Sequence, residues 1–253
     1  MVRPYDDCVA LPHVRDRKPP WRPARFASVV VEELAEAIVG GSLAEGDVLP
    51  TEPALCEQFA FSRTVIREAL KMLEERGLVR VEQGRGTSVQ PRDAWNLLDP
   101  LVLGIALAHD RDMALLENLV AVRAVLEREM ARASAGNLSA DDFAALDETL
   151  ARMRESYDDY DEFRAHDLAF HAIVMKASGN DVGLTIVRVI HRHGGITPLL
   201  SADSSREVLE QTTREHEAIY EALAARDGAL AGARIATHIE AAFAERKERL
   251  GRS

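Results

Sequence analysis

The sequence predicts a mainly α-helical protein with two domains. We expect three helices and a β-hairpin in the first domain, and an all-α antiparallel helical bundle in the second. Its 253 residues suit two domains of roughly 100–200 residues each. Apolar residues recur with helical spacing along most of the chain. Only two short segments have the pattern of strands, and they flank a glycine-rich turn.

Capping residues and apolar periodicity together mark the elements of the first domain. Thr51 and Ser62 each precede a helical pattern, and Gly77 follows one at the position where left-handed backbone is common. Helices followed by a hairpin form a winged helix-turn-helix, which we place at residues 25–91. The expected helices run over 26–40, 52–59 and 63–76, and strands over 78–82 and 87–90 are joined by Gln83-Gly84-Arg85-Gly86.

The remaining segments divide into an arm, a linker and a helical domain. Residues 1–24 are rich in Pro and Arg without apolar periodicity, which predicts a disordered N-terminal arm. Residues 92–100 form the predicted linker, and residues 101–250 the all-helical domain. Its expected helices, separated by Gly, Asn and Pro, run over 100–110, 112–135, 140–156, 159–177, 181–193, 204–225 and 228–250.

The composition argues against membrane and disulfide-rich proteins. No apolar run approaches the ~20 residues that a membrane-spanning helix needs. The N-terminal residues contain Pro, Arg and Asp where a signal peptide would need an apolar stretch. Cys8 and Cys56 are isolated, so they provide neither a disulfide framework nor a cysteine metal site. We therefore expect a protein of the reducing cytoplasm with no membrane partner.

The net charge of −11 is distributed unevenly. Residues 1–92 carry 13 Lys and Arg against 14 Asp and Glu, a balance of −1, and residues 93–253 carry 18 against 28, a balance of −10. Within the first part, residues 62–92 carry 7 basic against 4 acidic residues, a local balance of +3. The acidic second domain would repel DNA, whereas the short basic segment permits DNA binding.

The third expected helix begins with side chains suited to DNA. The N-terminal residues of a recognition helix lie nearest the base edges in the major groove. Arginine presents a planar fork that bonds both acceptors of guanine, and serine and threonine hydroxyls suit phosphate. The wing tip can reach the minor groove. A solvated helix face is the alternative for the two helical arginines. The candidate DNA contacts are Ser62, Arg63, Thr64, Arg67, Gly84 and Arg85.

The first domain resembles the DNA-binding domain of the GntR family. The resemblance lies in Gly41-x-Leu43-x-x-Gly46-x-x-Leu49-Pro50-Thr51-Glu52, Phe59-x-x-Ser62-Arg63-x-x-Ile66-Arg67-Glu68-Ala69-Leu70, Gly77-Leu78-Val79 and Gly84-Arg85-Gly86-Thr87-x-Val89. It implies binding to double-stranded operator DNA. Many members carry an arginine that reaches DNA directly after Leu-Pro-Thr-Glu, whereas this chain has Pro53. The operator can therefore differ from the common one.

Four residues of the second domain have the spacing of a metal site. Asp167 and His171 are four residues apart and share one helix face. His216 and His238 each lie eleven residues from Asp227, so an antiparallel helix hairpin would place them level. Oxygen and nitrogen donors without thiolate suit zinc, nickel, manganese or cobalt. Scattered core or surface histidines are the alternative, and the joint spacing favours a metal site.

The second domain resembles the C-terminal ligand-binding domain of the FadR subfamily. The matching residues are Arg123-x-x-x-Glu127, Asp167-x-x-Phe170-His171, Ala177-Ser178-Gly179-Asn180, His216 and His238. The resemblance implies that Asp167, His171, His216 and His238 hold a divalent metal ion, zinc or nickel by preference. It also implies that a small organic acid completes the coordination and that Arg123 binds this ligand, although a salt bridge from Arg123 to Glu127 or Glu129 is the alternative. The linker Trp95-Asn96-Leu97-Leu98-Asp99-Pro100 resembles members that respond to sugar acids.

These patterns together predict a transcription regulator, and they favour a repressor. A homodimer would place two recognition helices on the halves of a palindrome. One alternative is an all-α metal-dependent phosphohydrolase using the adjacent His166 and Asp167. Four protein ligands exceed the three usual in catalytic zinc sites, and that alternative leaves the first domain unexplained. A metal sensor, in which the cation is the signal, is a further alternative. We leave His166, His191 and His193 as surface residues or partners of the ligands.

Overall fold

The computed structural model describes residues 21–193 and 205–250 and divides the chain into two compact units, Met1–Asn96 and Leu97–Ser253. Most of the predicted arm, residues 1–20, lies outside the described residues. Helix α1 (Trp21–Val39) begins five residues before the expected start at Phe26, so the last part of the predicted arm is helical. No helix in the described ranges is both long and apolar enough to cross a membrane.

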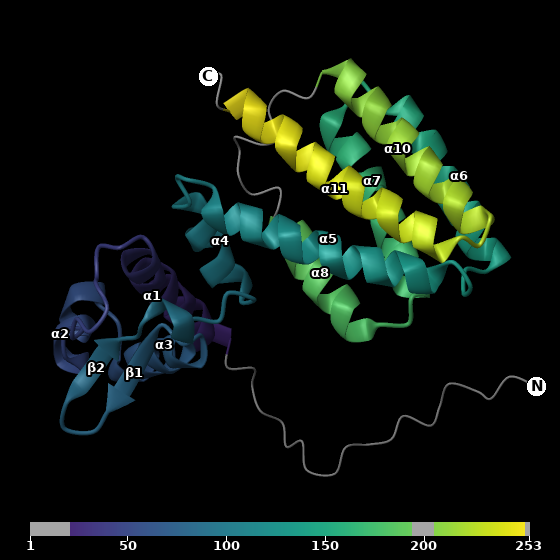
Figure 1. Cartoon of the computed structure of the whole chain (residues 1–253). Coiled ribbons are helices and arrows are strands. Elements are labelled where there is room, and N and C mark those ends of the chain that lie inside the picture. The colour runs from purple at the N-terminus through teal and green to yellow at the C-terminus, as the bar shows by residue number, and fades with distance from the viewer. Residues whose placement is uncertain (1–20, 194–204, 251–253) are drawn as a thin grey trace, which may run out of the picture. The chain divides into compact units, whose positions relative to one another are not determined.

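The first unit has the predicted order of elements (Figure 1). Helix α1 packs against α3 (Arg63–Glu75), and α2 (Glu52–Phe59) packs against the same helix. Strands β1 (Val79–Glu82) and β2 (Gly86–Val89) pair antiparallel, with Val79 opposite Val89 and Glu82 opposite Gly86. The winged helix-turn-helix prediction is therefore confirmed as a fold.

The predicted caps hold the ends of the two short helices. The Thr51 hydroxyl accepts a hydrogen bond from the Ala54 amide, and the Ser62 hydroxyl accepts one from the Val65 amide. At the end of α3, Gly77 has a φ of 73°, and its amide donates to the carbonyl of Glu74. The next amide, of Leu78, donates to the carbonyl of Leu73. This pair of bonds is the Schellman termination that glycine favours.

Much of the predicted linker belongs to the first unit. A 3₁₀ helix, Arg92–Ala94, follows β2, and the Trp95 indole donates to the Gln90 carbonyl at 3.0 Å. The amide of Asn96 donates to the carbonyl of Arg76, just beyond α3. Hydrogen bonds therefore hold residues 92–96 to the first unit. The sequence pattern predicted only a linker for this segment.

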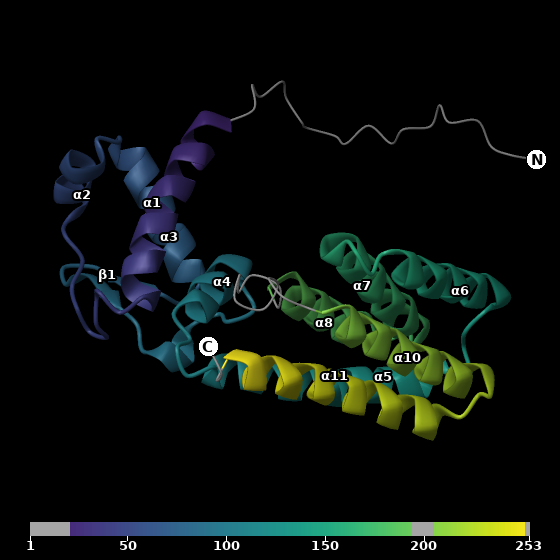
Figure 2. The same ribbon diagram turned by 90° about the horizontal axis from the view of Figure 1, so that it is seen from above.

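The second unit is the predicted helical bundle (Figure 2). Its helices are α4 (Pro100–Ala108), α5 (Ala114–Ser134), α6 (Ala140–Glu155), α7 (Tyr160–Ala177), α8 (Asp181–His193), α10 (Arg206–Ala224) and α11 (Gly228–Leu250). Helix α11 packs along α5 and α10, α6 packs against α7 and α10, and α8 packs against α5, α7 and α4. The Asp99 carboxylate caps α4 by accepting from the amides of Leu101 and Val102.

A single apolar cluster fills the interior of the bundle. Phe170, Met175, Ile219 and Leu223 are among its fully buried side chains. Three histidines and one glutamate are buried among them, which is unusual because such groups must be hydrogen-bonded to avoid a desolvation cost of several kcal/mol (~2–7). These polar groups therefore require a specific arrangement of the surrounding helices.

Gly77 provides a test of how the first unit closes. A Cβ at this position would lie 2.0 Å from the carbonyl oxygen of Ala94, and the φ is left-handed. We expect Gly77→Ala to lower the free energy of unfolding of this unit by about 3 kcal/mol, because steric overlap adds to the strain of the left-handed backbone. Denaturant unfolding followed by tryptophan fluorescence reports on this unit, since Trp21 and Trp95 are the only tryptophans.

Gly41→Ala is the matched control. Gly41 has a φ of +85°, but a Cβ added there would meet no atom within 4 Å, so only the backbone strain of about 1 kcal/mol applies. Equal losses in the two variants would contradict the close approach between Gly77 and Ala94.

Candidate functional site

The predicted DNA-contacting residues of α3 lie on its exposed surface. Ser62, Arg63 and Thr64 are exposed at the start of the helix, and the buried face consists of Val65, Ile66, Ala69, Leu70 and Leu73. The Arg67 guanidinium lies 2.8 Å from the Glu52 carboxylate at the start of α2 and remains 69% exposed. The ion pair places the Arg67 side chain beside the N-terminus of α2, and most of this side chain stays accessible to solvent.

Pro53 has a local structural role. It lies in the first turn of α2, where the missing N–H of proline breaks no helical hydrogen bond. The departure from the family pattern therefore preserves the helix while removing a cationic side chain from this surface.

The wing ends in a three-residue loop between Glu82 and Gly86. Gly84 has a φ of 78°, and Arg85 is 84% exposed with its guanidinium 3.6 Å from Glu82. An exposed guanidinium beside accessible backbone has the chemistry to contact a phosphate backbone or a minor groove. Both the start of α3 and the wing thus present cationic groups to solvent.

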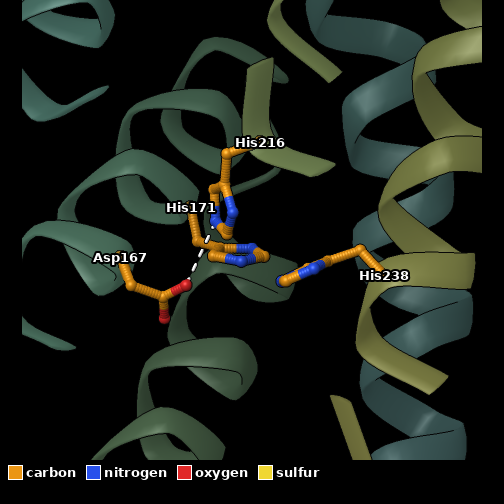
Figure 3. Close-up of side chains that lie close together, drawn as sticks. All are labelled: Asp167, His171, His216 and His238. Carbon is orange, nitrogen blue, oxygen red and sulfur yellow. Dashed lines mark ion pairs between the residues drawn. The ribbon is translucent and has the colours of Figure 1, made fainter. Parts of the chain in front are cut away.

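The four predicted metal ligands come together from three helices (Figure 3). Asp167 and His171 lie one turn apart on α7, His216 comes from α10 and His238 from α11. One ligand-type atom from each lies within 4.8 Å of those of the others. The ring centroids of His216 and His238 are 4.5 Å apart, as the level positions in the helix hairpin predict. The sequence-based prediction of convergence agrees with this geometry.

Hydrogen bonds orient each of the three imidazoles through Nδ1. The Nδ1 of His216 lies 2.8 Å from the carbonyl oxygen of Thr212. Because a carbonyl oxygen can only accept a hydrogen bond, this nitrogen carries the proton. His171 and His238 place Nδ1 at 2.5 Å and 2.7 Å from the carboxylates of Glu127 and Glu215. Oxygen acceptors on Nδ1 leave the three Nε2 lone pairs available as ligands.

Two of these Nε2 atoms are buried without a hydrogen-bond partner in the described part of the chain. They belong to His171 and His216, which are both fully buried. The Nε2 of His216 lies 3.1 Å from the Asp167 carboxylate, but the contact does not have hydrogen-bond geometry. Buried polar atoms rarely stay unpaired. These residues therefore fit a divalent cation, whose coordination would satisfy the unpaired atoms.

The electrostatics of the cluster favour the neutral form of His171 and His238 and the ionised form of Asp167. Burial, with the neighbouring His216 next in size, lowers the pKa of His238 to about 4. Burial also lowers the pKa of His171. Although burial by itself would raise the pKa of Asp167, the neighbouring imidazoles, His216 foremost, hold it well below its ordinary value. Neutral imidazole and ionised carboxylate are the forms that bind metals.

A cavity of about 120 Å³ lies beside the cluster. Asp167 and His238 form part of its wall, together with Arg123, Arg164 and His191. Arg123 donates from Nε to Glu127 at 2.6 Å, so the salt bridge considered as the alternative is present. Because that bond uses only Nε, the terminal nitrogens of Arg123 keep their donor capacity. The lining of the cavity therefore combines cationic groups with two of the candidate metal ligands.

Sequence reasoning missed two parts of this site. Glu127 was considered only as a partner for Arg123, although it also bonds His171 and His191; Glu215 was not singled out. A signal for Glu127 exists, because the charge occupies a core position of the apolar stripe on α5 between Ala124 and Ala131. His166 lies 3.8 Å from Glu162 outside the cluster, and the side chain of His193 lies outside the described residues.

A winged helix-turn-helix with exposed cationic side chains, joined in one chain to a helical domain with a ligand cavity, is the organisation of a one-component transcription regulator. Comparisons with known proteins identify its family. Residues 26–89 match the family described as bacterial regulatory proteins, gntR family, and residues 118–241 match the FCD domain.

Curated relatives extend the match over most of the chain. The galactonate operon transcriptional repressor of Escherichia coli is 31% identical over 221 residues, covering 87% of this chain and 96% of the relative. The regulator LutR of Bacillus subtilis is 30% identical over 210 residues, covering 80% and 92%. The repressor NanR of Klebsiella aerogenes is 28% identical over 232 residues, covering 90% and 88%. The chain belongs to the GntR family and carries an FCD domain.

A solved structure agrees in fold. That of Lar, described as controlling the Listeria monocytogenes agr system, has a TM-score of 0.55 and 19% identity, covering 88% of this chain and 96% of the other. This likeness supports the fold alone. Since the relatives are DNA-binding transcription regulators, this chain is a regulator and the phosphohydrolase alternative is rejected.

Proposed function

We propose that this regulator is a dimeric repressor whose affinity for its operator is controlled by a small carboxylate bound at a divalent-metal centre. The observation that carries the proposal is the set of three imidazoles anchored through Nδ1, two of them with unpaired Nε2 atoms, in a cluster whose Asp167 and His238 line a cavity together with Arg123. Asp167, His171, His216 and His238 would hold the ion. When bound, the ion supplies positive charge that attracts the carboxylate of the ligand.

The chain's own residues would select the ligand. The Arg123 guanidinium can bond a carboxylate through two parallel N–H groups, and its existing bond to Glu127 keeps it on the cavity wall. Apolar side chains such as Phe163 and Ile239 also line the cavity and suit the carbon skeleton of a small organic ligand. These features support an organic acid as the effector.

The name of one relative suggests a class of acid. That relative is described as a repressor of a galactonate operon, and galactonate is a sugar acid. Sequence identity of 31% leaves room for a different ligand within the class. We therefore propose a sugar acid or related hydroxy acid, with zinc or nickel as the ion.

The DNA-binding role is assigned to the start of α3 and the wing. Ser62, Arg63, Thr64 and Arg67 would enter the major groove, while Gly84 and Arg85 would approach the minor groove. A homodimer would present two such surfaces to the half-sites of a palindrome. The effector can change DNA affinity only through a preference for one arrangement of the dimer, typically by about 1–3 kcal/mol.

Selection of bound fragments from the source genome at about 0.15 M salt tests the operator prediction, because protein–DNA affinity depends on salt. We expect enrichment of a short palindrome. On that sequence, Arg63→Ala should weaken binding by about 1–3 kcal/mol, since a bidentate contact to guanine is lost. Enrichment no greater than that obtained with Arg63→Ala would contradict the assignment.

Arg63→Lys distinguishes base reading from phosphate contact. Lysine retains the charge but lacks the planar fork. A base-reading Arg63 predicts that the lysine variant loses discrimination among operator variants, whereas simple charge neutralisation would leave it intact. Competition binding with single-base changes in the palindrome provides the measurement.

Metal loading tests the second half of the proposal. We expect one divalent ion per chain to survive dialysis, and we expect His216→Gln to lower metal affinity by more than about 100-fold, because loss of an outer-shell partner alone costs about 10–100-fold. Atomic spectroscopy of dialysed protein measures the loading. His166→Gln is the matched control, since His166 lies on α7 outside the cluster. Equal metal loading in His216→Gln and His166→Gln would contradict the assignment of the four clustered residues as metal ligands.

The effector prediction can be tested with galactonate and other sugar acids. Metal-loaded protein should release the operator at saturating acid, and metal-free protein should respond much less because the ion attracts the carboxylate. Arg123→Ala should weaken the response without removing the ion. A change in operator affinity on metal addition alone, with no effect of any acid, would instead identify the cation as the signal.

A further inference from the structure

Glu127 connects the candidate metal centre to the cavity wall. Its carboxylate is fully buried on α5 and has three donors around it. The Nδ1 of His171 lies 2.5 Å from Oε2, while Arg123 and His191 approach Oε1 at 2.6 Å and 2.9 Å. Arg123 and His191 both line the cavity. One carboxylate thus contacts a candidate metal ligand on one side and two cavity residues on the other.

The arrangement determines the role of the Glu127 carboxylate. The Arg123 guanidinium can only donate, and its ion pair with Oε1 favours the ionised form of the carboxylate. An ionised carboxylate only accepts hydrogen bonds. His171 must therefore carry its proton on Nδ1, which leaves its buried and unpaired Nε2 facing the other ligands as a free lone pair.

A second metal ion at this position is the competing explanation, because Glu127, His171 and His191 also have ligand-type atoms within 4.8 Å of one another. Two observations favour a hydrogen-bonded network. The Arg123 guanidinium already lies against the same carboxylate and would repel a cation. The separation of 2.5 Å between Nδ1 and Oε2 suits a short hydrogen bond between them, whereas two ligands of one cation, each about 2 Å from it, lie farther apart.

We propose that Glu127 is a positioning residue that fixes the tautomer of His171 for metal binding and ties that ligand to Arg123 and His191 on the cavity wall. The proposal rests on the function proposed above, since it concerns the same metal centre. It assigns to α5, which supplies none of the four ligands, control over metal affinity. Glu215 on α10 has the equivalent role toward His238, to which it is hydrogen-bonded, but Glu215 does not line the cavity.

The tautomer can be measured in the wild-type protein without metal. Long-range ¹H–¹⁵N correlation spectra of protein labelled at histidine distinguish protonated Nδ1 from protonated Nε2, and His171→Gln assigns the signal. We expect His171 to be protonated at Nδ1 and bare at Nε2. The opposite tautomer overturns the proposal. This measurement does not depend on any variant of Glu127 remaining folded.

Metal affinity provides the second readout, obtained by titrating zinc against a competing chelator. Glu127→Gln should weaken zinc binding by about 10–100-fold, because the ligand loses its orienting carboxylate. Glu129→Gln is the matched control on the same helix, since Glu129 is 58% exposed and its ion pair among the described residues is with Arg132. Unchanged zinc affinity in Glu127→Gln, even with reduced thermal stability, overturns the positioning role.

Stoichiometry separates this inference from its alternatives. One zinc per wild-type chain agrees with the proposal, whereas two ions that fall to one in His191→Gln would identify a second metal site and overturn it. Absence of zinc binding by the wild type would overturn the proposed function itself. Normal binding by the wild type with equal affinity in Glu127→Gln would overturn only the inference about Glu127.

Discussion

The helical domain depends on one requirement: ionisable side chains placed inside an apolar bundle must be hydrogen-bonded or bound to an ion. Glu127, His171 and His216 are fully buried, yet they come from three different helices. Glu127 on α5 bonds His171 on α7 and His191 on α8, and these bonds can form only when the three helices hold one relative arrangement. The apolar core supplies most of the stability through burial, while this polar network restricts which packing of the helices is acceptable.

The same requirement explains why the imidazoles are suited to bind a ligand. Each Nδ1 is bonded to an oxygen of the protein, from Glu127, Thr212 or Glu215. Because these acceptors lie behind the rings, the remaining nitrogens are left for the centre of the cluster. A site of this kind is prepared by its supporting residues, and burial favours the neutral imidazoles that a cation needs.

The DNA-binding unit is subject to a different requirement, because its functional groups must stay accessible to solvent and to DNA. Arg63, Arg67 and Arg85 lie at the surface, and the contacts that Arg67 and Arg85 make with Glu52 and Glu82 are exposed ion pairs worth only about 0–1 kcal/mol. Such pairs can exchange for phosphate or base contacts at little cost. The backbone beneath these arginines is held by the helix caps and by the close approach of Gly77 to the Ala94 carbonyl. Weakly paired side chains therefore project from a well-anchored backbone.

The sequence by itself determined the local elements and the four-residue cluster. Periodicity and caps located nearly every helix within two residues, and the spacings around Asp227 brought His216 and His238 level, since local backbone preferences and helix geometry depend on near neighbours. The early start of α1 and the anchoring of residues 92–96 were not foreseen. Only the tertiary structure decided that Glu127 joins His171 to Arg123 and His191, because residues 44 and 64 positions apart meet through helix packing that no local pattern encodes.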